Sequence, residues 1–208
     1  MKGQIKIIKE EGNFEVKLGE RTLDLINRLS KLSEEESDTL LKESSEILSH
    51  CINPVDTVGN ITGLVFGYVQ SGKTMSFTTL STLAIDNGFR VIIYLTGTKN
   101  NLLEQTTKRL RKDLQISSVN RRRYKVFQNP ISDVNGINTL SNALKIRSKP
   151  AILITILKRE NYINHLSKLF SSNEIKSKLG NNGVLIIDDE ADQASLNTYA
   201  KFNSKNED

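Results

Sequence analysis

The sequence has few of the residues that crosslink a protein or anchor it in a membrane. Its 208 residues include one cysteine, Cys51, and no tryptophan. A single cysteine excludes an internal disulfide, and the two histidines, His50 and His165, are too far apart in sequence to suggest a zinc site. No apolar run approaches the roughly 18 residues that span a membrane, and the first residues lack the apolar stretch of a secretory signal. We therefore expect a cytoplasmic protein without a membrane partner, in which Cys51 is buried and structural.

The composition is otherwise ordinary, with 37% hydrophobic and 25% charged residues, and this length favours one domain. The net charge of +5 is concentrated between residues 108 and 125, where eight basic residues accompany one acid. This stretch carries +7, the rest of the chain carries −2, and the stretch includes the run Arg121, Arg122 and Arg123. Such a local excess suits a polyanion contact, but from charge alone a solvated helix face with an edge strand explains it equally well.

One stretch carries a specific chemistry. Residues 67–74 read GYVQSGKT and fit the phosphate-binding pattern G-x-x-x-x-G-K-[ST]. The glycines let successive backbone N–H groups face one anion, and a following helix adds its positive N-terminal dipole. The lysine reaches the outer phosphates, and the threonine hydroxyl is a ligand for Mg²⁺. The predicted nucleotide-binding residues are Gly67, Gln70, Ser71, Gly72, Lys73 and Thr74, of which Thr74 also contacts the metal.

The context of this loop agrees with a site rather than with an accidental match in a glycine-rich turn. An apolar run at 61–66 predicts a buried strand before the loop, and the spacing of apolar residues at 75–86 predicts a helix after it. Further strands are expected at 90–95, 123–127, 151–156 and 184–187, alternating with helices at 101–114, 137–146, 159–170 and 172–179. This alternation predicts an α/β fold with a parallel sheet and helices on both faces.

Ahead of this unit, the sequence predicts a helical leader. A short strand is expected at 5–8 and an amphipathic helix at about 23–32. Ser33 and Glu36 form a capping box, which predicts a second helix that starts there and runs to about residue 50. The expected organisation is a leader at 1–60, an ATPase lobe at 61–197 and a polar tail at 198–208, with the leader helices packed on the lobe.

A second motif follows the last predicted strand. The apolar residues 184–187 run directly into Asp188, Asp189 and Glu190, and ligands of parallel α/β sheets bind at the carboxyl ends of the strands. One carboxylate can hold the water shell of Mg²⁺ while the next deprotonates an attacking water. We assign Asp189 to Mg²⁺, with Asp188 as the second metal candidate, and predict Lys73 and Glu190 as the catalytic residues. Acids that merely cap a following helix are the alternative, but this predicts only one or two of them.

These motifs carry a resemblance. Residues 189–192, DEAD, resemble motif II of superfamily-two helicases, and residues 96–105 resemble their motif Ia. Residues 155–158 stand where motif Ib would fall but lack its usual Pro-Gly. In that family, motifs Ia and Ib contact the nucleic-acid backbone. The resemblance therefore implies a nucleic acid, DNA in the first instance, as a partner, with contacts from Thr98, Gln105 and Thr155, and with Lys158 as a further candidate. We place the basic stretch 108–125 beside this surface, so Arg121, Arg122 and Arg123 are added as candidates on the ground of charge.

A closer resemblance is to the Z-one domain family of bacterial proteins, which are described as endonucleases with a helicase-like ATPase core and are often linked to restriction or phage defence. It rests on VQSGKT at 69–74, LTGT at 95–98 and DDEADQAS at 188–195, and it covers about residues 55–197. It implies a RecA-like P-loop lobe that binds and hydrolyses ATP with Mg²⁺. No carboxylate and lysine cluster of the nuclease type accompanies these motifs, so nuclease activity is not expected.

Superfamily-two motors need a second RecA-like lobe, and its motifs are missing from this sequence. We therefore expect the ATP-binding lobe of a nucleic-acid-dependent ATPase, incomplete without a second lobe or partner subunit. One alternative is a nucleotide-gated DNA-binding scaffold that hardly hydrolyses ATP. Another is a small-molecule kinase, but the sequence offers no arginine-rich lid beyond residues 121–123.

Overall fold

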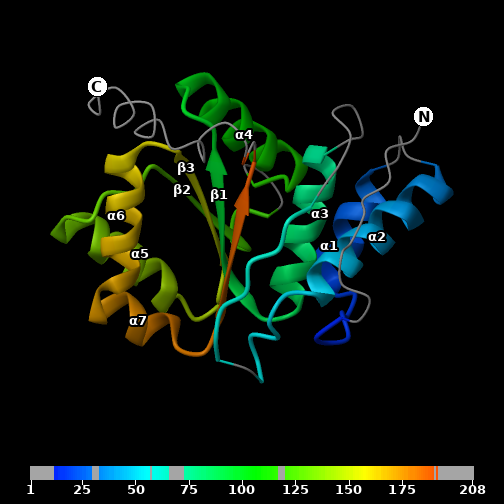
Figure 1. The fold of residues 1–208 in the computed structure, drawn as a ribbon, viewed down its shortest axis with the longest axis horizontal. Helices are drawn as coiled ribbons and strands as arrows, with labels where there is room; N and C mark the ends of the chain where they lie inside the picture. Colours follow the sequence, from blue (N-terminus) through cyan, green and yellow to red (C-terminus); the bar gives the residue numbers. More distant parts are fainter. Residues whose placement is uncertain are drawn as a thin grey trace, which may run out of the picture.

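The centre of the molecule is a parallel four-stranded sheet. The computed structural model describes residues 12–29, 33–56, 58–65, 73–116, 120–189 and 191. The strands stand in the order β2-β3-β1-β4, and every neighbouring pair is parallel (Figure 1). Their bounds are β1 Phe89–Thr96, β2 Tyr124–Gln128, β3 Ala151–Leu157 and β4 Gly183–Asp188. Parallel pairing places all four carboxyl ends at one edge of the sheet, which we call the carboxyl edge, and all four starts at the opposite amino edge.

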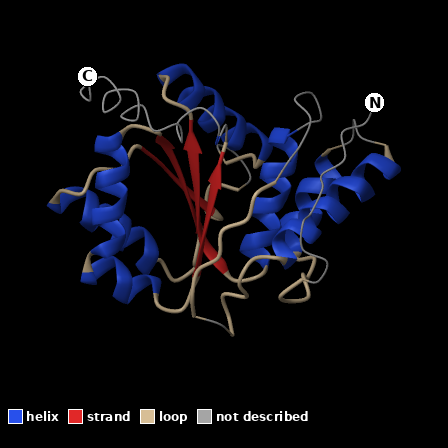
Figure 2. Ribbon diagram, viewed as in Figure 1, coloured by secondary structure: helices blue, strands red, loops and turns tan. Residues whose placement is uncertain are grey.

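Helices cover both faces of this sheet (Figure 2). One face carries α3, Lys73–Asp86, and α4, Asn100–Asp113. The other carries α5, Val134–Lys145, α6, Glu160–Ser171, and α7, Asn173–Leu179. The predicted α/β fold with a parallel sheet and helices on both faces is therefore confirmed, and it is consistent with a Rossmann-like or RecA-like arrangement.

The two central strands explain why the sheet is sandwiched. Every residue of β3 is buried, and in β1 only Leu95 is partly exposed. Side chains alternate between the faces of a strand, so Ile92 joins the core beneath α3 and α4 whereas Ile93 joins the core beneath α5, α6 and α7. A continuous apolar run is what a parallel strand buried on both faces requires.

The strand predicted at 61–66 is not formed over its described part. Residues 61–65 have no regular secondary structure, and Phe66 lies outside the described residues. The side chains of Leu64 and Val65 are 60% and 45% exposed, so this stretch lacks the burial that stabilises a strand. The strand predicted at 5–8 and the polar tail also lie outside the described part of the chain. No helix in the described residues is long and apolar enough to cross a membrane.

Two helices precede the sheet, and both pack against α3. Helix α1 spans Glu20–Arg28, and α2 spans Glu34–Ser49. The predicted capping box is present, because Ser33 accepts from the backbone of Glu36 and the Glu36 carboxylate accepts from the backbone of Ser33. Just beyond α2, Cys51 is half-buried rather than fully buried as predicted, and this burial raises the pKa of its thiol.

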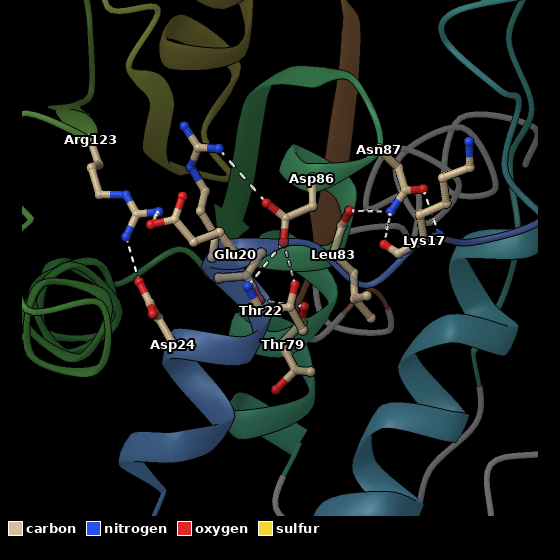
Figure 3. A network of polar contacts seen from close by, with 11 residues as sticks. Lys17, Glu20, Thr22, Asp24, Thr79, Leu83, Asp86, Asn87 and Arg123 are labelled. Carbon is tan, nitrogen blue, oxygen red and sulfur yellow. Dashed lines mark hydrogen bonds and ion pairs between the residues drawn. The ribbon is translucent and has the colours of Figure 1, made fainter.

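The end of α3 holds the leader in place (Figure 3). The Asp86 carboxylate, 4% exposed, accepts hydrogen bonds from the Thr22 amide at 3.0 Å and the Thr22 hydroxyl at 2.8 Å. It therefore caps the start of α1 from another helix, a task that Gly19 at the N-cap cannot perform. Next to it, the Asn87 side chain accepts from the Lys17 amide and donates to the Lys17 carbonyl.

Replacing Asp86 by alanine should loosen this junction. The change leaves the buried hydroxyl and amide of Thr22 without their acceptor, and we expect the free energy of unfolding to fall by about 1–3 kcal/mol. Urea unfolding followed by circular dichroism measures the change. Asp38→Ala, at an exposed position on α2, is the matched control and should change stability by less than about 0.5 kcal/mol. Equal stability of the two variants would contradict a capping role for Asp86.

Candidate functional site

The loops that follow β1, β3 and β4 are joined at the carboxyl edge. The amide of Lys158, after β3, donates to the carbonyl of Gly97, after β1, at 3.0 Å. The amide of Asp189, after β4, donates to the carbonyl of Leu95 at 3.1 Å. Arg159 adds a hydrogen bond from Nε to the carbonyl of Thr98 at 3.0 Å. The structure thus brings the start of the acidic run next to the Thr98 turn.

Helix α3 begins at the same edge. It packs along β1, ends at Asp86 and reaches β1 through a turn in which Gly88 has a φ of +96°, a value that favours glycine. Helix and strand are therefore antiparallel, and 14 residues place the start of α3 about 21 Å from that turn. The predicted loop residues Gly67, Gln70, Ser71 and Gly72 lie outside the described residues. Lys73 and Thr74 begin α3, and their side chains also lie outside the described part.

A cavity of about 140 Å³ opens between α3, α4 and the carboxyl edge. Asp189 lines it together with Phe77 and Thr78, which lie one turn beyond the start of α3. The rest of its wall is formed by β1 and α4 and includes Tyr94, Thr96, Gly97, Leu102, Gln105, Thr106, Arg109 and Leu110. The cavity therefore joins a predicted metal ligand, Asp189, to a predicted nucleic-acid contact, Gln105.

The polar residues of the cavity wall differ in how freely their side chains can reorient toward a ligand. Tyr94 is buried and its hydroxyl shares a 2.6 Å hydrogen bond with Ser81. Burial raises the pKa of Tyr94, although the Ser81 bond opposes this shift. Arg109 is half-exposed and lies 3.8 Å from the Asp113 carboxylate, too far for a tight pair. Arg109 is thus a cation that can turn toward a group bound in the cavity. Its place in the cavity wall was not predicted from the sequence.

The two aspartates of the acidic run have different surroundings. The Asp188 carboxylate forms an ion pair with the ammonium group of Lys158, whose side chain is only 6% exposed. Asp188 itself is 41% exposed. Lys158 comes from the end of β3 and reaches past the end of β1, which lies between β3 and β4. Asp188 is therefore already neutralised by a protein cation, whereas Asp189 faces the cavity, and Glu190 lies outside the described residues.

The predicted nucleic-acid contacts separate into surface and core residues. Thr98 and Gln105 are exposed at the carboxyl edge. Thr155 is completely buried in the middle of β3, and its hydroxyl shares a 2.7 Å hydrogen bond with Thr107 of α4. Its interpretation as a backbone contact is wrong, because its hydroxyl ties α4 to the sheet. In a β-branched apolar run, a threonine is a normal core residue.

The basic run Arg121, Arg122 and Arg123 is not beside this edge. It precedes β2, so it lies at the amino edge, at the opposite end of the sheet. Arg121 and Arg122 are exposed, but Arg123 forms ion pairs with Glu20, at 3.1 Å, and with Asp24. Arg123 therefore joins α1 to the start of β2, and its predicted role in nucleic-acid binding is not retained.

The residues at the carboxyl edge suit a hard cation and a phosphate. Asp189 offers carboxylate oxygens to the cavity, and oxygen is the ligand that Mg²⁺ prefers. Within the described ranges, no three His, Cys, Asp or Glu side chains come together as a metal cluster. Mg²⁺ beside nucleotides is usually held by one or two carboxylates plus phosphate and water, so its binding does not require such a cluster.

No family model, curated protein or solved structure matches this chain. The resemblance to the Z-one family and to superfamily-two helicases therefore stays a prediction that rests on the motifs.

The ion pair between Lys158 and Asp188 can be measured by a double-mutant cycle. Lys158→Met and Asp188→Asn should each lower the free energy of unfolding, since the first removes the cation beside the partly exposed Asp188 carboxylate and the second removes a carboxylate that pairs with a largely buried ammonium group. The double variant should lose less than the sum of the two, with a coupling energy of about 0.5–3 kcal/mol. Chemical unfolding of the four proteins gives this value. If the two losses of unfolding free energy are strictly additive, the ion pair contributes nothing to stability.

Proposed function

We propose that this chain is the ATP-binding lobe of a helicase-like, nucleic-acid-dependent ATPase. One observation carries the proposal: Asp189 at the end of β4 lines the same cavity as Phe77 and Thr78, one turn past the phosphate-loop residues Lys73 and Thr74. The two motifs are more than a hundred residues apart in sequence; parallel pairing places both at the carboxyl edge, and the neighbouring positions of β1 and β4 bring them to one cavity. Ligands of parallel α/β sheets bind at this edge.

Each residue then has a task that its chemistry supports. Backbone N–H groups of residues 67–72 and the dipole of α3 bind the phosphates, and Lys73 holds the outermost one. Thr74 and Asp189 supply oxygen ligands, and Mg²⁺, when bound, neutralises charge on the phosphates. Glu190 orients and deprotonates the attacking water. Lys158 keeps the Asp188 carboxylate engaged, which favours Asp189 over Asp188 as the metal ligand.

The nucleic-acid part of the proposal rests on the hydrogen-bonded loops. Thr98 is exposed, and its carbonyl is held by Arg159, which follows Lys158 in the chain. Lys158 in turn pairs with Asp188. A nucleic-acid phosphate bound at Thr98 would therefore be connected to the acidic run through Arg159 and its neighbour Lys158. A second RecA-like lobe, on another segment or subunit, would complete the site, as in the superfamily-two motors that the motifs resemble.

ATP binding should depend on Lys73. Lys73→Ala removes the cation that contacts the outer phosphates, and we expect no measurable binding of ATP by calorimetry. Lys99→Ala is the matched control, because Lys99 is an exposed lysine at the same edge, before α4. ATP binding that survives Lys73→Ala would refute the proposed site.

Turnover should depend on Glu190 without affecting binding. Glu190→Gln keeps the size of the side chain but cannot deprotonate water, so ATP should bind normally and phosphate release should stop. The unmodified lobe itself should be slow, since loss of a transition-state arginine costs about 10³–10⁵ in rate in related NTPases. Phosphate release is measured with and without single- and double-stranded DNA. Tight ATP binding with no turnover in any of these conditions would favour a nucleotide-gated scaffold instead.

The two aspartates should differ in their effect on Mg²⁺. Asp189→Asn removes a carboxylate that faces the cavity, so ATP binding should need roughly tenfold more Mg²⁺, equivalent to about 1.4 kcal/mol. Asp188→Asn should shift this requirement much less, because its carboxylate is engaged by Lys158. Calorimetric titration of ATP at several Mg²⁺ concentrations separates the two. The reverse order would assign the metal to Asp188.

A further inference from the structure

Six exposed cations gather at the amino edge, at the opposite end of the sheet from the cavity. They come from three separate segments that precede or approach the starts of β2 and β3. The six are Arg111 and Lys112 at the end of α4, Arg121 and Arg122 before β2, and Arg147 and Lys149 before β3. We refer to these residues as the amino-edge patch.

Hydrogen bonds hold the three segments together. Tyr124 of β2 pairs with Ala151 of β3, and the Ala151 amide donates to the Arg123 carbonyl at 2.9 Å. Arg122 and Lys149 therefore both stand two residues before a paired position of neighbouring strands. Asn120 ties the end of α4 to the same place, because its side chain donates to the Leu114 carbonyl at 2.9 Å. The patch is thus a fixed surface and not a charged tail.

Most charges of the patch are not offset by nearby acids. Asp113 lies near both Arg109 and Lys112 of the patch, whereas Glu20 and Asp24 pair with Arg123, and Glu174 pairs with Lys145. Among the described residues, none of the six cations of the patch forms an ion pair. Two of the six, Arg111 and Lys112, complement the dipole at the end of α4. The other four do not lie in the last turn of a helix, so the helix dipole does not account for their charge.

Lys149 adds an independent indication. Its φ is +47°, in the left-handed region that favours glycine or asparagine over lysine. Its amide closes a turn with the Ile146 carbonyl at 2.9 Å, and its side chain is exposed. The side chain makes no described contact that would compensate for this conformation. Residues kept in unfavourable backbone conformations are concentrated at functional sites.

We propose that the amino-edge patch binds the phosphate backbone of a nucleic acid, at a surface separate from the Thr98 turn. Exposed arginines and lysines on several segments, without interleaved acids, match a row of phosphates. The four patch residues outside α4 stand before the starts of two adjacent strands, β2 and β3, so they can follow a backbone across the sheet edge. The proposal does not rest on ATP binding, because the patch and the cavity lie at opposite ends of the sheet.

Binding of a short fluorescein-labelled DNA duplex, followed by fluorescence anisotropy, tests this proposal. If all six cations contact phosphates, affinity should fall about 10³-fold between about 50 and 200 mM salt, and it should depend little on sequence. R121E/R122E and R147E/K149E should each lower affinity at least about tenfold and reduce the salt slope by about 2. K17E/K42E changes the net charge equally at exposed positions elsewhere and should lower affinity less than about threefold.

A conservative variant separates binding from folding. Lys149→Asn removes the charge and places at this φ a residue that tolerates it better. It should keep or raise the thermal midpoint, lower DNA affinity severalfold and reduce the salt slope by about 1. If affinity in this folded variant equals that of the unmodified chain, the patch does not contact phosphate.

Other results would also overturn the proposal. Absence of DNA binding at low salt would do so, as would an equal loss in K17E/K42E, which would indicate a response to net charge alone. Binding to phosphatidylserine vesicles without binding to DNA would show that the patch recognises a membrane surface. Loss of DNA binding in Lys73→Ala, with the patch intact, would indicate that the nucleic acid binds at the carboxyl edge, beside the proposed nucleotide site. These results leave the ATP-binding tests unaffected.

Discussion

Parallel pairing of β1 with both β3 and β4 is the constraint on which the rest of the structure depends. It buries the two central strands on both faces, so helices must cover the sheet on each side. It also gives the sheet two chemically different edges. Every loop that leaves a strand emerges at one edge, and every loop that enters a strand arrives at the other. The acidic run and the Thr98 turn share the first edge for this reason alone.

This separation of edges changes how the charge of the chain is understood. The basic stretch at 108–125 is continuous in sequence, but it begins in the second half of α4 and ends in β2, so its residues face different surfaces. Arg109 lines the cavity at the carboxyl edge, whereas Arg121 and Arg122 lie at the amino edge. Arg123 belongs to neither group, since Glu20 and Asp24 neutralise it. One charged stretch thus contributes to two surfaces and to one internal junction.

Much of the fold could be predicted because its signals are local. The apolar runs of β1 and β3, the capping box at Ser33 and the carboxylates after β4 all depend on near neighbours in sequence. The errors concern residues whose environment is set by distant segments. Thr155 looks like a surface contact until Thr107 of α4 is seen against it. The apolar run at 61–65 has the composition of a strand, but its exposed side chains lack a partner in the described part of the chain.

The same limit applies to the candidate site. The sequence places Asp188 and Asp189 side by side as metal candidates and ranks Asp189 first, but nothing within ten residues shows how their surroundings differ. The distinction comes from Lys158, which lies thirty residues before Asp188 in the chain and two strands away in the sheet. An ion pair between residues of different strands leaves no periodic pattern in the sequence, because it requires neither particular residue types nor a particular spacing.

The attachment of the leader to α3 determines how that helix can move. Asp86 and Asn87 bind Thr22 and Lys17 at one end of α3, while Lys73 stands at the other, about 20 Å away. Sliding of α3 along its axis would break all of these hydrogen bonds at once. A tilt about the Asp86 end would preserve them and still displace the Lys73 end by the largest amount. These hydrogen bonds therefore fix the Asp86 end of α3 to the leader, so that any displacement of the helix that keeps them would grow toward the Lys73 end.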